Sequence, residues 1–264
     1  MLIRRLLRAG YEYLALYIGL GVLGVGCLVW CLAAAVLRPL LPRQWGRRLG
    51  RRMVMGGFRF YLWVLEAIGA CRFDVSELDQ LRGAGPMIVA PNHPCLLDAV
   101  MVLSRLPDLA CIMKASLIDN IFLGAGARLA GYIRNDSLLG MAVRAVDELR
   151  AGGQLLVFPE GTRTADLPVS AFRGVFPVLA SRAGVPVQTV FIETDSPYLC
   201  KGWPLFRRPS MPIHYRVRLG ERFDPPSDFQ GFAGSLATYY AAQLADSPMN
   251  AALSDWLQAQ KRTA

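Results

Sequence analysis

The sequence predicts an α/β fold, a mostly parallel sheet flanked by helices, with a transmembrane or membrane-hairpin helix at the amino terminus. Two observations lead to this prediction. From Pro86 onward, short apolar runs alternate with helical patterns and turn residues, as in chains that alternate strands with helices. Before that point, residues 13–37 are uncharged and mostly apolar. A chain of 264 residues suits one such domain with an appendage.

Six short apolar runs are expected to form the sheet. They are Met87–Ala90, Ala110–Met113, Tyr132–Arg134, Gln154–Phe158, Val187–Ile192 and Ile213–Leu219. Helical patterns lie between them, including Leu138–Arg150 and Val175–Ala183, the second closed by Gly184. Sheets of this kind bind ligands at the carboxyl ends of their strands, so residues directly after a strand are the first candidates for a functional site.

The apolar segment near the amino terminus is long enough to cross a bilayer. As a helix, residues 13–37 would span roughly 37 Å, more than the ~30 Å hydrocarbon core. Tyr11, Tyr13 and Tyr17 at one end and Trp30 towards the other suit the two membrane interfaces. A cleaved signal peptide and a hairpin that only dips into the membrane are the alternatives. The length of the segment and the arginine cluster after it favour a retained membrane segment over a signal peptide.

Three regions are expected from this pattern. Residues 1–52 form a membrane anchor with basic flanks, residues 53–80 an amphipathic interfacial helix and linker, and residues 81–264 the α/β domain. The second region contains an apolar stretch, residues 53–70, that Arg59 and Glu66 interrupt. Pro39 and Pro42 are expected to break the helix between the apolar segment, residues 13–37, and residues 53–70.

The charge of the chain is concentrated beside the apolar segment. The formal net charge is +9, and residues 1–52 hold nine arginines against one acid. This distribution indicates anionic headgroups of a membrane as the partner, not nucleic acid, which would place the charge on the folded domain. More of these arginines follow the apolar segment than precede it, which predicts that the carboxy-terminal domain lies on the cytoplasmic face of the inner membrane.

The cysteines give no sign of a metal centre. The six cysteines show no paired C-x-x-C spacing, which argues against a zinc site or a disulfide framework. No metal or other cofactor is therefore expected.

The first candidate motif follows the first predicted strand. Residues 92–98 read Asn-His-Pro-Cys-Leu-Leu-Asp. If Asp98 accepts a hydrogen bond from one ring nitrogen of His93, it fixes the tautomer and leaves the other nitrogen to take the proton of a hydroxyl group. A surface histidine beside an acid at a helix start is the alternative, because such a spacing also occurs by chance.

The second candidate motif follows the predicted strand that begins at Gln154. Residues 158–163 read Phe-Pro-Glu-Gly-Thr-Arg. Exposed amides at Gly161, the Thr162 hydroxyl and the Arg163 guanidinium would suit a phosphate group, and Glu160 could hold Arg163 or a second base in place. The alternative is an ordinary turn with a surface ion pair.

Together the two motifs resemble those of the glycerolipid acyltransferases typified by bacterial 1-acylglycerol-3-phosphate acyltransferase. The order of the motifs, their separation and the strand before each agree with that family, and the resemblance runs from about Pro86 to Leu219. Residues 131–135, Gly-Tyr-Ile-Arg-Asn, resemble its second block, with Lys114 at the upstream edge, and residues 185–187, Val-Pro-Val, resemble its fourth. Cys95 stands where the family often has serine, Ile121 where a proline is common, and Gly174 lies one residue early.

The resemblance implies a role for each matching residue. His93 is the base and Asp98 its partner. The acceptor site is shaped by Lys114, Arg134, Glu160, Gly161, Thr162 and Arg163, with Pro186 near the acyl chain.

The chain is accordingly expected to be a membrane-bound acyltransferase. It would move a fatty acyl group from a thioester of acyl carrier protein or coenzyme A to the hydroxyl of a lysophospholipid, foremost 1-acylglycerol-3-phosphate. One alternative keeps the chemistry on another lipid acceptor, an amino-lipid, glycolipid or polyene-type precursor. A second is a catalytically silent membrane scaffold that binds acyl carrier protein.

Two further residues offer alternatives within the site. Cys95 could act with His93 and Asp98 as a thiol nucleophile, although a cysteine two residues from the histidine is poorly spaced to approach it. His214 alternates with apolar residues along a predicted strand and is expected to be structural.

Overall fold

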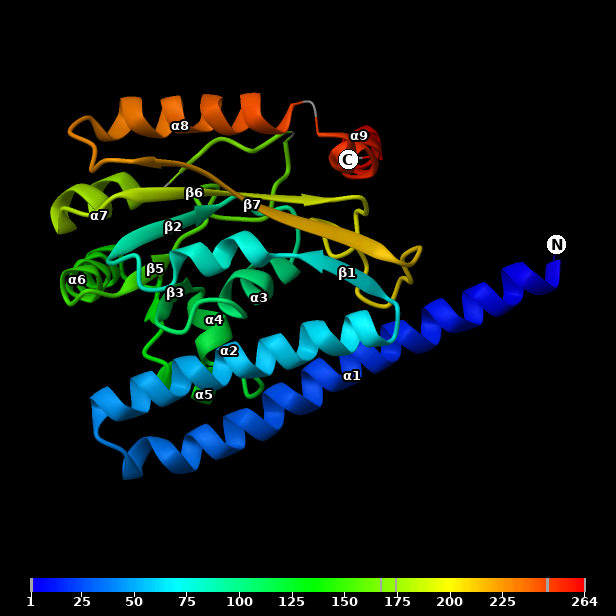
Figure 1. The fold of residues 1–264 in the computed structure, drawn as a ribbon, viewed down its shortest axis with the longest axis horizontal. Coiled ribbons are helices and arrows are strands. Elements are labelled where there is room, and N and C mark those ends of the chain that lie inside the picture. The colour runs from blue at the N-terminus through cyan, green and yellow to red at the C-terminus, as the bar shows by residue number, and fades with distance from the viewer. Residues whose placement is uncertain (1, 167, 174, 246, 264) are drawn as a thin grey trace.

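A seven-stranded sheet forms the centre of the molecule in the computed structural model, which describes residues 2–263 except 167, 174 and 246 (Figure 1). Gly174 therefore lies outside the described residues. The strand order is β1-β7-β6-β2-β5-β3-β4. Neighbouring strands are parallel except for β6 and β7, which are antiparallel. The predicted fold class, a mostly parallel sheet flanked by helices, is confirmed.

All six predicted strands are present with small changes at their ends. The strands are β1 (Cys71–Asp74), β2 (Met87–Pro91), β3 (Leu109–Met113), β4 (Ile133–Arg134), β5 (Gln154–Leu156), β6 (Val187–Thr194) and β7 (Ile213–Phe223). The sequence analysis missed β1, which pairs in parallel with β7 from Cys71 opposite Ile213. Four residues are too few to show a clear alternation, and this strand depends on a partner that is distant in sequence.

Helices cover both faces of the sheet (Figure 1). In chain order they are α1 (Leu2–Leu40), α2 (Arg43–Ala67), the 3-10 helix η1 (Ser76–Leu81), α3 (Leu97–Leu103), α4 (Ala115–Ile118), α5 (Gly124–Leu129), α6 (Leu138–Arg150), α7 (Phe176–Ala183), α8 (Phe229–Leu244), the 3-10 helix η2 (Pro248–Asn250) and α9 (Ala251–Thr263). One apolar core joins the sheet to α2, α3 and η1, and a second joins it to α6, α7 and α8.

The first two helices form an antiparallel hairpin along one side of the domain (Figure 1). α2 begins at Arg43, directly after Pro42, so the expected boundary at residue 52 falls inside a helix. Pro39 lies within the last turn of α1 and does not end it. β1 lies in the stretch expected to be a linker, and it belongs to the sheet. The hairpin is thus continuous with the domain.

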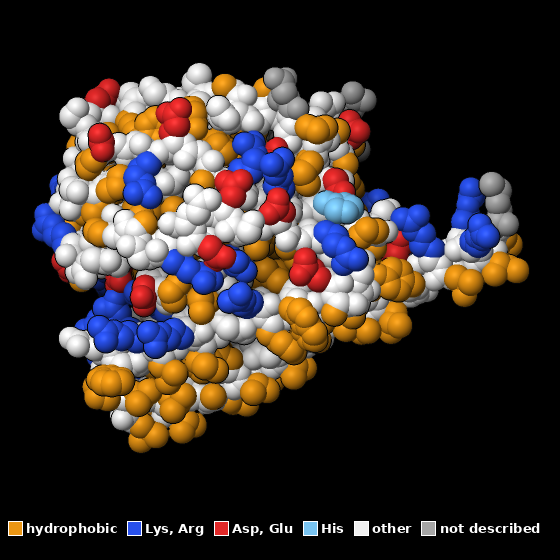
Figure 2. All heavy atoms as spheres, viewed as in Figure 1, with side chains coloured by type: hydrophobic (Ala, Val, Ile, Leu, Met, Phe, Trp, Pro, Cys, Tyr) orange, Lys and Arg blue, Asp and Glu red, His pale blue; other side chains and the backbone are white. Residues whose placement is uncertain are grey.

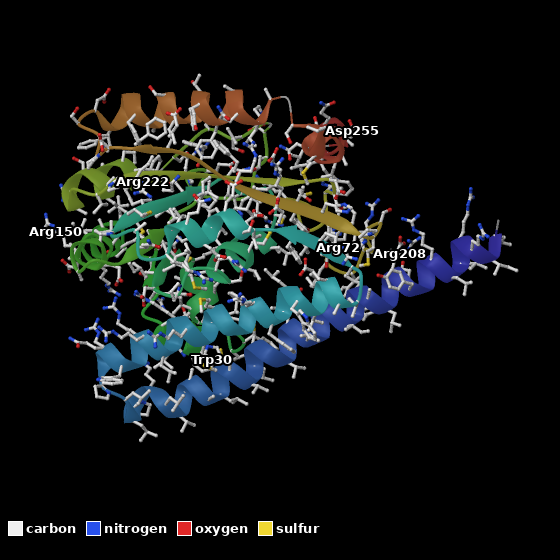
Figure 3. The ribbon with its side chains drawn as sticks, in the orientation of Figure 1. Trp30, Arg72, Arg150, Arg208, Arg222 and Asp255 are labelled. Atoms are coloured by element: carbon white, nitrogen blue, oxygen red, sulfur yellow. The ribbon has the colours of Figure 1, made fainter. Side chains whose placement is uncertain are left out.

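A buried carboxylate fixes the amino-terminal half of α1. Glu12 is 2 % exposed and forms ion pairs with Arg8 of the same helix and with Arg208. Arg208 lies beside this half of α1, in the segment before β7 (Figure 3). Because a buried carboxylate needs partners, these contacts define how α1 lies on the domain.

Apolar side chains gather along the outer edge of the hairpin (Figure 2). In α1 the exposed ones include Leu14, Val25, Leu32 and Leu40, and α2 adds Trp45. α1 is long enough and apolar enough to cross a membrane, as judged by length and composition. Arginine side chains border the apolar edge on its domain side (Figure 2). The hairpin therefore offers a face suited to lipid beside a band suited to anionic headgroups.

A buried ion pair connects α2 to α6. Arg51 donates to Glu148 at 2.8 Å, and both side chains are 7 % exposed. Arg47 also donates to Glu148, while Arg51 reaches the carbonyl oxygens of Ala130 and Asp108. Burial, with a smaller effect of Arg47, lowers the pKa of Arg51 to about 10, so the guanidinium stays charged at neutral pH. Cutting the chain after residue 52 would remove both partners of Glu148.

Replacing Glu148 with alanine should destabilise the protein strongly. The change leaves Arg51 buried and without its carboxylate, which typically costs about 3–5 kcal/mol. Thermal unfolding in a neutral detergent measures this as a lowered midpoint. Asp79→Ala is the control, since Asp79 also pairs with two arginines, Arg82 and Arg105, but is 36 % exposed. We expect the control to lose less than about 1 kcal/mol. Equal losses would contradict the role given to the buried pair.

Candidate active site

The two sequence motifs meet at the carboxyl ends of neighbouring strands. β2 pairs in parallel with β5, with Val89 opposite Leu156, so the residues that follow the two strands emerge at the same edge of the sheet. The first motif supplies His93 and the second supplies Glu160. Their direct contact is a hydrogen bond of 2.9 Å from the His93 amide to Oε1 of Glu160. The fold thus joins segments that lie 67 residues apart in the chain.

His93 and Asp98 form a hydrogen-bonded pair. Nδ1 of His93 lies 2.8 Å from Oδ2 of Asp98. Asp98 is fully buried in the first turn of α3, whereas the histidine side chain is 16 % exposed. A buried carboxylate that accepts from Nδ1 places the proton on that nitrogen and leaves Nε2 with a free lone pair. The ring of His93 stacks on Phe158 with 3.9 Å between centroids, which fixes its plane.

Cys95 supports Asp98. Its amide donates to Oδ2 of Asp98 at 2.7 Å, and its thiol donates to Oδ1 at 3.1 Å. Burial, followed by the nearby Asp98 charge, raises the pKa of the Cys95 thiol well above its usual value. A thiol that is 1 % exposed and held as a donor cannot serve as a thiolate nucleophile. The geometry therefore disfavours the covalent alternative.

Glu160 organises the site from inside. Its side chain is 2 % exposed, and both carboxylate oxygens are occupied. Oε1 accepts from the His93 amide and from the Thr164 hydroxyl at 2.8 Å, and Oε2 accepts from the Ser170 amide at 2.9 Å. The sequence analysis expected Glu160 to shape the acceptor site and to hold Arg163 or a second base. In the structure its oxygens are instead bonded within the protein, and it does not pair with Arg163. It holds the backbone of both motifs.

Arg163 contacts the loop after β6. Its Nη1 donates to the carbonyl oxygens of Leu199 and Cys200 at 2.9 and 2.7 Å. Leu199 has a positive φ of 59°, a conformation that a leucine seldom adopts, and its carbonyl oxygen also accepts from the amide of Leu96. One guanidinium thus connects the second motif to a loop that touches the first.

Arg134 is held by two carboxylates. It binds Asp119 through two hydrogen bonds of 2.7 and 3.2 Å, and Asp136 through one of 2.8 Å. Hydrogen bonds first from Asp119 and then from Asp136 raise its pKa. Lys114 is exposed directly after β3, the strand next to β4. Lys114 thus lies one strand beyond β5 and Arg134 two strands beyond it. The ion-pair partners of Arg134 are the nearby acids Asp119 and Asp136.

The remaining predicted residues lie at different places. Gly161 and Thr162 are exposed in the turn after β5, and the Gly161 amide donates to the Phe158 carbonyl, so it is not free for a substrate. Pro186 precedes β6, where its carbonyl accepts from the amide of Ile88 at the amino end of β2. The structure therefore places Pro186 at the opposite end of the strands from His93, about 16 Å away along the sheet.

Sequence reasoning missed the polar residues that hold Glu160. Thr164 also donates its amide to the His93 carbonyl at 2.7 Å, so it binds both motifs. Ser170 accepts from the amide of Ala165 and closes the loop. The only sequence signal was the position of Thr164 directly after the second motif. Ser170 gave none, because its loop is defined by contacts with Glu160.

The cluster around His93 is distinct from a metal centre and from the second histidine, His214. Within the part of the chain that the structure describes, no three or more His, Cys, Asp or Glu side chains group so that they could hold a metal ion. His214 lies on β7, half exposed, with Nδ1 2.6 Å from Asp195. The described residues near His93 instead offer one nitrogen base, held in one tautomer at the sheet edge, which suits removal of a proton from a substrate hydroxyl.

Comparison with known proteins agrees with this chemistry. A family model described as Acyltransferase matches residues 72–193. The chain is 24 % identical over 188 residues to the 1-acyl-sn-glycerol-3-phosphate acyltransferase of Pseudomonas aeruginosa, covering 69 % of this chain and 72 % of the relative. It is 30 % identical over 180 residues to the lyso-ornithine lipid O-acyltransferase of the same organism, covering 67 % and 65 %.

The fold also has a counterpart among solved structures. The crystal structure of the 1-acyl-sn-glycerophosphate acyltransferase of Thermotoga maritima superposes with a TM-score of 0.63 at 22 % identity, covering 92 % of this chain and 96 % of the other. That identity supports the shared fold only. The family match and the named relatives support an acyltransferase family like that of the 1-acylglycerol-3-phosphate and lyso-ornithine lipid enzymes.

Proposed function

We propose that this protein transfers a fatty acyl group from a thioester of acyl carrier protein or coenzyme A to the hydroxyl of a lysophospholipid, foremost 1-acylglycerol-3-phosphate. The observation that carries the proposal is the His93–Asp98 pair, placed by the Glu160 carboxylate against the second motif. The match of residues 72–193 to the acyltransferase family model supports the reaction class.

The reaction follows from the state of His93. Nε2 removes the proton from the acceptor hydroxyl while its oxygen attacks the thioester carbonyl and forms a tetrahedral intermediate. Collapse of the intermediate breaks the carbon–sulfur bond, and the imidazolium returns the proton to the departing thiolate. Asp98, which accepts from Nδ1, stabilises the imidazolium between the two steps. The Gly161 amide is used within its own turn, so it is not a donor to the oxyanion.

A second acceptor is favoured by one observation. Arg134, expected to bind an acceptor phosphate, is already paired with Asp119 and Asp136. Two relatives at 30 % and 34 % identity are named lyso-ornithine lipid O-acyltransferase. An ornithine headgroup carries an ammonium group, which a surface with two carboxylates can bind. We therefore keep a lyso-amino-lipid as the alternative acceptor for the same chemistry.

A catalytically silent scaffold that binds acyl carrier protein is less well supported. Such a protein needs the fold but has no use for a partly exposed histidine whose tautomer is fixed by a buried acid.

We further propose that the enzyme works at the cytoplasmic face of the inner membrane, held there by the α1–α2 hairpin. The apolar edge of the hairpin and the arginines beside it support this placement (Figure 2). Acceptor and product are both lipids, so attachment to the bilayer keeps the site beside its substrates.

Replacing His93 with alanine should lower kcat by at least ~10²-fold, the usual share of a general base. Asp98→Asn should also be severe, because an amide can donate to Nδ1 and so stabilise the wrong tautomer. Purified protein in detergent, a labelled acyl thioester and mass spectrometry of the product measure both effects. Unchanged thermal midpoints would show that the variants fold. Near wild-type turnover in folded His93→Ala would remove the proposed mechanism.

Cys95→Ser should keep most of the activity. A serine hydroxyl can make the hydrogen bond that the thiol now makes to Asp98, and the thiol is not the nucleophile. The native Cys95 should also resist alkylation at neutral pH, because burial raises its pKa. Activity is compared in the same assay, and intact-protein mass spectrometry follows alkylation and acylation. A stable acyl-thioester on Cys95 would establish the covalent mechanism instead.

Arg134→Ala should separate the two acceptors. If Arg134 contacts the phosphate of 1-acylglycerol-3-phosphate, its loss should raise KM for that acceptor about 10-fold with a smaller change in kcat, because the phosphate is bound in both ground and transition states. KM for a lyso-ornithine lipid should hardly change.

Arg163→Ala is the matched comparison for that experiment. It should impair both acceptors alike, since Arg163 holds the loop at Leu199 and Cys200. An Arg134→Ala variant that loses as much activity on the lyso-ornithine lipid as on the phosphate acceptor would count against a phosphate contact. The amino-lipid alternative would then move ahead.

A further inference from the structure

A groove opens between the end of α1 and α5, on the side of the molecule that carries the hairpin. It has a volume of about 330 Å³ and is lined by Ala35, Arg38, Pro39, Ala125 and Arg128. That volume is at the lower end of the range for sites that bind small molecules. None of the residues of the His93 cluster lines it. The groove is therefore a separate feature of the fold.

The walls of the groove are held close together. Trp30 of α1 packs against Gly126 of α5, where a Cβ would come within 2.5 Å of the indole nitrogen. Cys31, also in α1, donates to the carbonyl oxygen of Phe122 before α5. Because both contacts lie within a few turns of the groove, its shape is a property of the fold and not of loose side chains.

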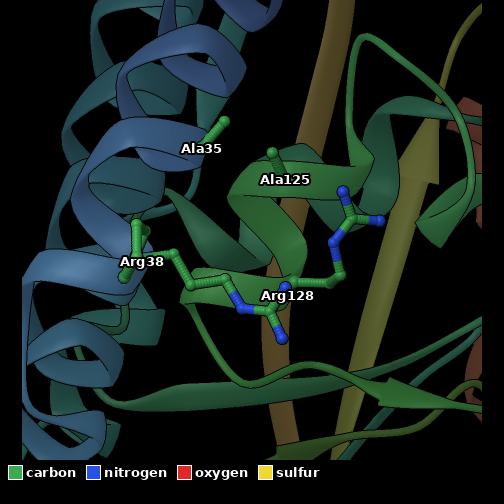
Figure 4. A pocket seen from close by; sticks show the side chains of 5 residues that line it. Ala35, Arg38, Ala125 and Arg128 are labelled. Carbon is green, nitrogen blue, oxygen red and sulfur yellow. The ribbon is translucent and has the colours of Figure 1, made fainter.

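Two arginines give the groove a positive charge that the protein does not neutralise. Arg38 reaches from the last turn of α1 towards α5, which carries Arg128 (Figure 4). Among the residues that the structure describes, no carboxylate pairs with either one. Nη1 of Arg128 donates to the carbonyl oxygen of Ile118 at 2.6 Å, which leaves its other donors available. Two unpaired guanidinium groups beside one groove fit an anion.

Apolar side chains close in sequence to the groove lining are exposed. Val36 and Leu40 on α1 are 63 % and 70 % exposed, and Ile121 before α5 is 72 % exposed. An ion in free solution gains nothing from such apolar side chains. An anionic group that carries acyl chains gains contact with both the arginines and the apolar side chains.

We propose that the groove between α1 and α5 binds the phosphate of an anionic bilayer phospholipid, with Arg38 and Arg128 on the headgroup and the acyl chains along Val36, Leu40 and Ile121. This lipid is a bound component of the surrounding membrane and not the substrate at His93. Its binding fixes how deeply the hairpin sits in the bilayer. The proposal goes beyond the acyl transfer itself and does not depend on the identity of the acceptor.

Phosphatidylglycerol in neutral detergent micelles is the probe, with phosphatidylcholine as its zwitterionic counterpart. The full-length protein should bind phosphatidylglycerol more tightly. Replacing both arginines, Arg38→Gln with Arg128→Gln, should weaken that binding about 30-fold if each contributes as a basic residue does at an anionic surface. Lysine at both positions should recover only part of the affinity, because lysine lacks the planar fork. Titration with a phosphatidylglycerol labelled on its acyl chain gives the dissociation constants.

The control variant removes two positive charges at a site away from the groove. Arg150→Gln with Arg182→Gln changes two exposed arginines on α6 and α7 and should leave phosphatidylglycerol binding within about 2-fold of the wild type. Thermal midpoints show whether each variant folds. An equal loss in the control, full recovery by lysine, or equally strong competition by soluble glycerol phosphate would each overturn the lipid site. These outcomes are independent of acyl transfer, so failure here and failure of the proposed function are distinguishable.

Discussion

The buried carboxylate of Glu160 is the contact on which the arrangement of this protein's site depends. One side chain accepts hydrogen bonds from the backbone amides of His93 and Ser170 and from the hydroxyl of Thr164. Thr164 and Ser170 are buried, and an unpaired buried donor costs about 1–3 kcal/mol, so these bonds favour the observed mutual position of the loops after β2 and β5. The second motif thus holds the backbone of the first motif in place.

Burial and hydrogen-bond partners distinguish the residues that hold the site from those that face a substrate. Asp98 and Glu160 are buried and bonded to backbone or to Cys95, whereas Nε2 of His93 is the polar atom of the cluster left to react. Arg163 binds loop carbonyls, and Arg134 binds acids. Both guanidinium groups therefore already have partners within the protein, and an acceptor headgroup would have to bind beside these partners or displace them. A phosphate would have to displace Asp119 or Asp136 from Arg134, or join them, while an ammonium group would find those acids in place.

The hairpin and the domain depend on each other through buried charge. Glu148 ties Arg47 and Arg51 of α2 to α6, and Glu12 ties α1 to the segment before β7. Buried ion pairs add little net stability but penalise every alternative arrangement in which one charge is left alone. They consequently set the orientation of the apolar edge relative to the sheet. Under the proposed attachment to a bilayer, that orientation decides which part of the domain meets the lipid surface.

The sequence by itself determined the strands from β2 to β7, the helix from Leu138 to Arg150, and the pair of motifs at the strand ends, because periodicity and turn residues are local properties. It also determined the apolar segment and its basic flanks. Only the tertiary structure decided that β1 joins the sheet, that α2 begins at Arg43, and that Pro186 lies away from His93. It also decided the partners of Glu160, Arg134 and Arg163. Those features rest on contacts between distant segments, and a buried carboxylate or a guanidinium takes whichever donors and acceptors the folded chain brings within reach.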